Sequence, residues 1–313
     1  MHPATIGSPG LWIGFIGFVI VMLALDLGVF HRKSHVVGFR EALGWSAVWI
    51  ALALVFNAGV WWQFGAQPGI EFLTGYLIEK SLSIDNIFVF VVIFSTLGIP
   101  ALYQHRVLFW GILSALVLRA VMIFAGAAML ERFHWLIYVF GAFLILTGVK
   151  LFRQRGQEQN LEDSAALRWA RKVVPSTERF DGERFFTHEN GKRVATPLFL
   201  ALLLVEFTDV VFAIDSIPAI FAITRDPFIV FTSNIFAILG LRSLFFVLAD
   251  MVKRFAYLKV GLAAVLVFVG AKMSLVDVYK VPPLASLVVI AMLLGGSIWF
   301  SLAKSRGKAV ATA

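Results

Sequence analysis

Long apolar runs, separated by short polar connections, make up most of the chain. A helix needs about 20 mainly apolar residues to cross the hydrocarbon layer of a bilayer, and nine of the runs are of about that length. The pattern therefore predicts an all-α polytopic membrane protein with about nine transmembrane helices. These are expected near residues 11–30, 42–62, 72–97, 107–130, 134–152, 197–223, 228–250, 256–276 and 283–303.

Two of the runs, about 130 residues apart, carry the same pattern of polar side chains. Aligning them pairs Glu79 with Asp209, Asp85 with Asp215, and Asn86 with Ser216. The correspondence continues through the next two runs of each copy. It pairs Arg119 with Arg242, and Gly148-Val149-Lys150 with Gly270-Ala271-Lys272. Three consecutive predicted helices are therefore duplicated.

A duplicated unit of three helices has an odd number of spans, so its two copies must cross the membrane in opposite directions. Such inverted repeats are typical of secondary transporters, whose substrate site lies at the repeat interface near the membrane midplane. The chain then divides into five parts. They are two peripheral helices (1–71), the first repeat (72–152), a connecting loop (153–196), the second repeat (197–277), and a last helix with a short tail (278–313).

Composition and charge agree with a membrane protein. Hydrophobic residues make up 60% of the 313 residues, and charged residues only 15%. The net charge of +8 does not indicate nucleic-acid binding, because most Lys and Arg lie in the short connections. With the N-terminus outside, the inner segments hold 19 Lys and Arg and the outer loops hold three. The positive-inside rule therefore predicts the N-terminus outside and the C-terminus inside.

Acidic residues lie in the middle of both duplicated runs. A carboxylate at that depth costs roughly 2.5–3.5 kcal/mol on insertion scales, so such residues usually face a cavity and indicate an ion or proton path. Carboxylate and amide oxygens suit Mn²⁺, Ca²⁺ and Mg²⁺. We therefore predict a divalent metal site at the repeat interface, formed by Glu79, Asp85, Asn86, Glu206, Asp209 and Asp215.

The spacing of the acids sets a geometric condition. Residues six apart point about 120° away from each other on an ideal helix, so Asp209 and Asp215 cannot both reach one small site from it. Pro218 removes one helical hydrogen bond, and we expect both acid-bearing helices to open, as is tolerated where backbone lines a cavity. Arg119 and Arg242 lie near the middle of their runs. Their predicted role is to balance the acidic charge or to anchor the acids structurally.

The connection 153–196 is the one long polar segment, with nine basic and seven acidic residues. The positive-inside rule assigns it to the cytoplasm. LEDSAALRWARKVV has the pattern of an amphipathic helix, and Asn190-Gly191 is typical of a tight β-hairpin turn. The segment is either a solvated connector or a small gating or partner-binding element.

Residue types that are missing exclude other kinds of chemistry. The chain has no cysteine, so disulfides, thiolate metal ligation and thiol redox chemistry are excluded. The sequence also shows no candidate nucleophile, no buried histidine metal site and no phosphate-binding glycine loop. We therefore expect a protein that is not an enzyme and has no resident cofactor, with a transported divalent ion as its ligand and the lipid bilayer as its surroundings.

Several segments resemble a known family. EKSLSIDNIFVF, EFTDVVFAIDSIPAIFA and TSNIFAILGLRSLFF resemble signature segments of the TerC family of bacterial integral membrane proteins, most closely its Alx-type members. LDLGVFHRKSH and YVFGAFLILTGVKLF extend the resemblance over about residues 10–280. It implies the wider LysE-related transporter group, a bacterial cytoplasmic (inner) membrane location and manganese export. The family's acidic positions correspond to the six predicted site residues.

The function expected from the sequence is a divalent cation transporter, most specifically a Mn²⁺ exporter coupled to protons. Transport of Ca²⁺ or another divalent ion is an alternative. A membrane scaffold or metal-delivery protein of a tellurite or alkaline stress response is a second alternative, from a different class. The acidic motif and the absence of thiols give no support to an oxyanion site, although the family name refers to tellurite.

Overall fold

The computed structural model describes residues 5–28, 38–133, 135–153, 172, 174–189, 191–248, 258–279 and 281–311. Within these ranges, the backbone but not the side chain is described at residues 26–28, 84, 85, 88, 215, 258, 259, 302 and 304–311. The predicted cytoplasmic helix at 161–174 therefore lies almost entirely outside the described residues.

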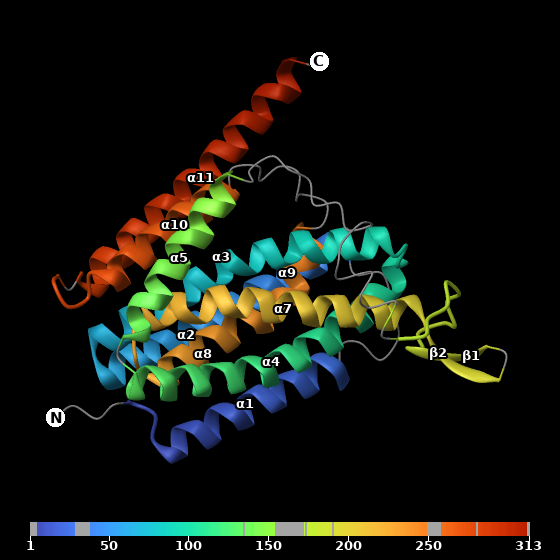
Figure 1. Ribbon diagram of the computed structural model, residues 1–313, viewed down its shortest axis with the longest axis horizontal. Coiled ribbons are helices and arrows are strands. Elements are labelled where there is room, and N and C mark those ends of the chain that lie inside the picture. The colour runs from blue at the N-terminus through green and yellow to red at the C-terminus, as the bar shows by residue number, and fades with distance from the viewer. Residues whose placement is uncertain are drawn as a thin grey trace.

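Helices dominate the fold, as the apolar runs predict (Figure 1). The N-terminal half contains α1 (Pro9–Gly28), α2 (Phe39–Phe64), α3 (Ala66–Thr96), α4 (Ala101–Arg132) and α5 (Leu136–Arg153). A hairpin of β1 (Phe186–Glu189) and β2 (Lys192–Ala195) follows. The C-terminal half contains α7 (Pro197–Phe221), α8 (Pro227–Leu239), α9 (Leu241–Leu248), α10 (Leu258–Ser274) and α11 (Pro283–Ala311).

Each of the nine predicted spans contains a helix, with α8 and α9 sharing one span. By length and hydropathy, however, five helices of the described chain are long and apolar enough to cross a membrane, or six if the bent pair α8 and α9 counts as one span. The helical parts of α1 and α10 that pass the hydropathy test are shorter, and α3 carries Glu71, Glu79, Lys80 and Asp85. The protein is an all-helical, multi-pass membrane protein apart from its small hairpin.

The two copies of the predicted repeat pack against each other. In the core, α3 lies against α7 and α8, and α7 also lies against α4. Figure 1 shows α3, α7 and α4 side by side, while α5, α10 and α11 run at an angle to them. The third helices of the two copies, α5 and α10, pack directly on one another.

Two close contacts between α5 and α10 are equivalent under the repeat alignment. A Cβ atom added at Gly148 would lie 2.7 Å from the carbonyl oxygen of Ala263, and one added at Gly270 would lie 2.6 Å from that of Gly141. The alignment pairs Gly148 with Gly270 and Gly141 with Ala263. Small residues let membrane helices approach at backbone distance, and here the same contact is made twice.

The hairpin predicted at Asn190-Gly191 is confirmed. The strands pair antiparallel, with Glu189 opposite Lys192, and Gly191 has a φ of 74°, which glycine adopts without a steric penalty. The hairpin extends beyond the N-terminal end of α7 (Figure 1). The hairpin and the described residues that precede it, from 174 on, form what we call the hairpin lobe. Arg106 of α4 contacts this lobe through a 3.1 Å ion pair with Glu183.

The predicted opening of the acid-bearing helices is wrong. The helix α3 is continuous from Ala66 to Thr96, and α7 is continuous through Pro218 to Phe221. Because Pro218 lies in the last turn of α7, its missing N–H costs one hydrogen bond and the helix then ends. The broken span is α8–α9, whose two parts differ in direction by 42° on either side of Gly240.

Candidate cation site

A buried ion-pair network lies where α3, α4, α7 and α8 meet. Arg119 of α4 places Nη2 2.9 Å from Oδ1 of Asp209 and Nε 3.3 Å from Oδ2 of the same residue, both on α7. Its Nη1 donates to Oε1 of Glu79 on α3. The exposed fractions are 1% for Arg119, 0% for Glu79 and 4% for Asp209. One guanidinium therefore joins the acids that the repeat alignment pairs.

Two neutral side chains complete the surroundings of the guanidinium. Ser216 Oγ on α7 and Asn234 Oδ1 on α8 each lie 3.5 Å from Nη1 of Arg119. The carboxylates of Glu79 and Asp209 face the single guanidinium of Arg119, so these three charged side chains carry one net negative charge when ionised. Water cannot screen charges at this depth, and the excess negative charge favours a cation nearby.

Several buried oxygens near this network have no hydrogen-bond partner among the described residues. They are Oε2 of Glu79, Oγ of Ser83 and Oδ1 of Asn86, all on α3. Their spacing of four and three residues puts them on one face of the helix. A buried polar atom left unsatisfied costs about 1–3 kcal/mol, so such groups usually bind a water molecule or an ion. This row of oxygens has the chemistry that a hard cation requires.

The other predicted site residues lie on the same helices. Glu206 of α7 is partly buried, and its Oε1 accepts a hydrogen bond from Ser114 Oγ of α4. Asp85 and Asp215 lie within α3 and α7, but their side chains are outside the described part of the structure. Arg242, the counterpart of Arg119, is buried near the start of α9, with 6% exposed.

Among the side chains that the structure describes, no three His, Cys, Asp or Glu come together in a way that could hold a metal ion. Glu79 and Asp209 lie on either side of the Arg119 guanidinium, so the guanidinium stands where a shared cation would have to bind. Glu206 is hydrogen-bonded to Ser114 and forms no part of this ion-pair network. The arrangement is thus a centre in which a protein cation partly neutralises two buried acids.

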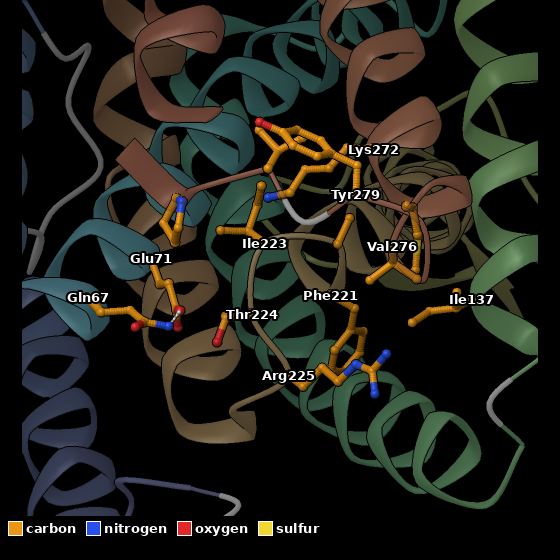
Figure 2. Close-up of a pocket in the computed structure, with 14 residues that line it drawn as sticks. Gln67, Glu71, Ile137, Phe221, Ile223, Thr224, Arg225, Lys272, Val276 and Tyr279 are labelled. Carbon is orange, nitrogen blue, oxygen red and sulfur yellow. Dashed lines mark hydrogen bonds between the residues drawn. The ribbon is translucent and has the colours of Figure 1, made fainter. Parts of the chain in front are cut away.

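Two cavities lie at opposite ends of the α3–α7 pair. The first, of about 240 Å³, is at the start of α3 and the end of α7 (Figure 2). The second, of about 430 Å³, is at the end of α3 and the start of α7, beneath residues 176–178 of the hairpin lobe. The buried network therefore lies on the two helices that connect these cavities.

The first cavity contains an acid that the sequence analysis did not single out. Glu71 is 9% exposed, and its Oε1 accepts a 3.0 Å hydrogen bond from Gln67 Nε2 (Figure 2). Thr224, which follows α7, and Lys272 of α10 line the same cavity. Glu71 lies eight residues before Glu79, which places the two acids about 80° apart around α3. The spacing from Glu79 is the feature of the sequence from which Glu71 could have been predicted as a further site residue.

Comparison with known proteins identifies the family. Residues 64–309 match the model of the "Integral membrane protein TerC family". No solved structure matches the chain. The family match covers all elements that carry the buried network.

Relatives match over nearly their whole length. An "Uncharacterized membrane protein STKORF319" of Myxococcus xanthus is 74% identical over 302 residues, covering 96% of this chain and 95% of the relative. The "Putative membrane-bound redox modulator Alx" of Escherichia coli (strain K12) is 49% identical over 295 residues, covering 91% and 92%. An "Uncharacterized membrane protein" of Rickettsia bellii is 44% identical over 283 residues, covering 90% and 94%. The chain therefore belongs to the TerC family of integral membrane proteins and is a homologue of Alx.

Proposed function

We propose that this protein is a divalent cation transporter of the bacterial cytoplasmic membrane, most specifically a Mn²⁺ exporter that exchanges metal for protons. The observation that carries the proposal is the buried network of Glu79, Arg119 and Asp209 beside the unpartnered oxygens of Ser83 and Asn86. Ionisable residues inside a membrane protein are costly and typically line ion paths.

The transported ion binds to oxygens of both repeats in this proposal. The helix α3 contributes Glu79, Asp85 and Asn86, and α7 contributes Glu206, Asp209 and Asp215. Carboxylates and an amide suit Mn²⁺, Ca²⁺ or Mg²⁺. The neutralising role predicted for Arg119 gains support from its direct contacts to Glu79 and Asp209.

Charge balance gives the exchange a physical basis. A divalent ion that reaches Glu79 and Asp209 repels the Arg119 guanidinium, which must move away from at least one of the two acids. When the ion leaves, the guanidinium or protons neutralise the acids again, because isolated carboxylates are strongly disfavoured in a low-dielectric interior. Metal and protons therefore compete for the same carboxylates.

An inverted repeat with nine spans provides the alternating access in this proposal. The equivalent contacts of Gly148 and Gly270 support a two-fold relation between the copies. With the N-terminus outside and the C-terminus inside, the cavity at Glu71 opens outward, and the cavity beneath the hairpin lobe opens to the cytoplasm. The ion path then follows the α3–α7 pair from one cavity to the other.

The name of the Alx relatives refers to redox modulation. The present chain has no cysteine, so thiol exchange by its own side chains is excluded. A transporter of a redox-active ion such as manganese would change the supply of that metal to other proteins. Transport through the acidic site is therefore compatible with a redox-modulating effect.

Metal flux into proteoliposomes tests the proposal. Purified protein should move Mn²⁺, and Asp85→Ala and Asp215→Ala should each abolish the flux while leaving the protein folded. Asp181→Ala, which changes an acid of the hairpin lobe, is the control and should retain flux. Competition by Ca²⁺, Mg²⁺ and Zn²⁺ in the same assay identifies the preferred ion. Wild-type protein that moves none of these ions would contradict transport and favour a scaffold or metal-delivery role.

A further inference from the structure

Lys80 is a lysine within the membrane-spanning core that the buried acidic network does not use. It directly follows Glu79, but successive residues turn by 100° on a helix, and Lys80 points toward the break between α8 and α9. Its Nζ donates a 3.2 Å hydrogen bond to the carbonyl oxygen of Ala237. Among the described residues, no acidic side chain forms an ion pair with it.

The carbonyl that Lys80 contacts belongs to the end of a half-helix. Ala237 lies in the last turn of α8, which ends at Leu239. The last carbonyls of a helix have no intrahelical partner and carry the negative end of the helix dipole. In broken transmembrane helices, such C-terminal ends bind Na⁺ or H⁺. The Lys80 ammonium therefore occupies a position that suits a small cation.

Glycine at the break makes room for the ammonium. A Cβ atom added at Gly240 would lie 2.8 Å from Nζ of Lys80 and 3.1 Å from Cβ of Trp49 on α2. An added Cβ would therefore displace the Lys80 ammonium from its present position, and it would pack unusually tightly against Trp49. Lys80, Gly240 and the Ala237 carbonyl thus form one small niche, closed by α2 on the other side.

The equivalent contact under the repeat alignment, between α7 and α4, has neither the lysine nor the break. The repeat alignment places Val210 at the position of Lys80 and Val117 at that of Gly240. The helix that contains Val117, α4, runs unbroken from Ala101 to Arg132. The lysine, the glycine and the broken helix therefore occur together at the contact between α3 and α8, and not at the equivalent contact between α7 and α4.

We propose that the end of α8 is a monovalent-cation position that the Lys80 ammonium occupies as a tethered ion. The ammonium neutralises the partial negative charge of the α8 carbonyls and holds the broken span against α3. Removing the side chain opens the niche to free Na⁺ or K⁺. This inference concerns the stability of the break and does not depend on which ion the protein transports.

Thermal unfolding of purified full-length protein tests the proposal. Unfolding is followed in NaCl, in KCl and in N-methyl-D-glucamine chloride at one ionic strength. Wild-type Tm should not depend on the cation. For Lys80→Ala, Tm should fall in N-methyl-D-glucamine and then rise saturably by about 5 °C or more with Na⁺ or K⁺, as a ligand that binds only the folded state requires.

Three further variants separate charge from other effects. Lys80→Gln keeps a donor for the Ala237 carbonyl but no charge, and should also respond to Na⁺ or K⁺. Adding Gly240→Ala to Lys80→Ala fills the niche and should abolish the response. Lys272→Ala, in the cavity of Figure 2, is the matched control and should show no cation-specific change.

The outcomes decide the proposal either way. A Lys80→Ala protein whose Tm is the same in all three salts overturns it. So does a Lys80→Gln protein with wild-type Tm and no cation response, because the hydrogen bond alone then suffices. Failure to obtain folded Lys80→Ala in either NaCl or KCl also counts against it, since a free cation should replace the ammonium.

Discussion

Arg119 of α4 donates two hydrogen bonds to the carboxylate of Asp209 on α7, from Nη2 to Oδ1 at 2.9 Å and from Nε to Oδ2 at 3.3 Å. This bidentate geometry is the strongest form of an arginine–carboxylate pair. Because Glu79 of α3 contacts the same guanidinium, one side chain links helices of both repeats. The first two predictions follow from this link.

Arg119→Ala should destabilise the protein by about 3–5 kcal/mol, because it leaves two buried carboxylates without their partner. Denaturant unfolding in detergent measures the change. The control is Arg184→Ala, whose ion pair with Asp181 is 3.5 Å long and exposed, and which should cost less than about 1 kcal/mol. Equal losses for the two variants would show that the buried network does not carry this energy.

Mn²⁺ should stabilise Arg119→Ala more than it stabilises the wild-type protein. Without the guanidinium, Glu79 and Asp209 are free to bind a divalent ion, and an ion that binds only the folded state raises Tm. Melting curves with increasing MnCl₂ provide the measurement, with Arg119→Ala/Asp209→Asn as the matched variant that has lost an acid. If Mn²⁺ raised Tm equally in all three proteins, these acids would not be its ligands.

Alanine at Gly148 or Gly270 should destabilise the α5–α10 contact, because the added Cβ would approach a backbone carbonyl to 2.7 or 2.6 Å. We expect a loss of about 1–3 kcal/mol for each, and similar losses for the two if the contacts are equivalent. Gly59→Ala is the control, since nothing lies within 4 Å of its added Cβ. There, alanine should stabilise helix α2 by up to about 1 kcal/mol. Denaturant unfolding of the three variants compares them.

Single cysteines should report the proposed topology directly, because the chain has no cysteine of its own. Val278→Cys, at a side chain that is 85% exposed, should react with a membrane-impermeant maleimide in intact cells. Glu178→Cys, in the hairpin lobe, should react only after the cells are permeabilised. Labelling of both positions from the same side would refute the assignment of 153–196 and of the loop after α10 to opposite faces.

The hydrophobic pattern was sufficient to predict where helices form, since burial in lipid requires long apolar segments whose backbone is satisfied internally. The Asn190-Gly191 pair predicted the hairpin turn, because the local backbone conformation there depends on residue type. The alignment of the two acidic runs paired Glu79 with Asp209 before any contact between them was visible. These features depend on local sequence or on internal similarity.

The tertiary structure alone decided which groups meet. The sequence predicted a helix opening at Pro218, whereas the break lies at Gly240, where Lys80 from another helix satisfies the freed carbonyl of Ala237. It placed Arg119 in the middle of a span but did not identify its partners, because these depend on how α4 is rotated against α3 and α7. The cavity at Glu71 requires the ends of α3, α7 and α10 to converge. Periodicity fixes which residues share a face of one helix, but the partner of that face depends on packing among all the helices.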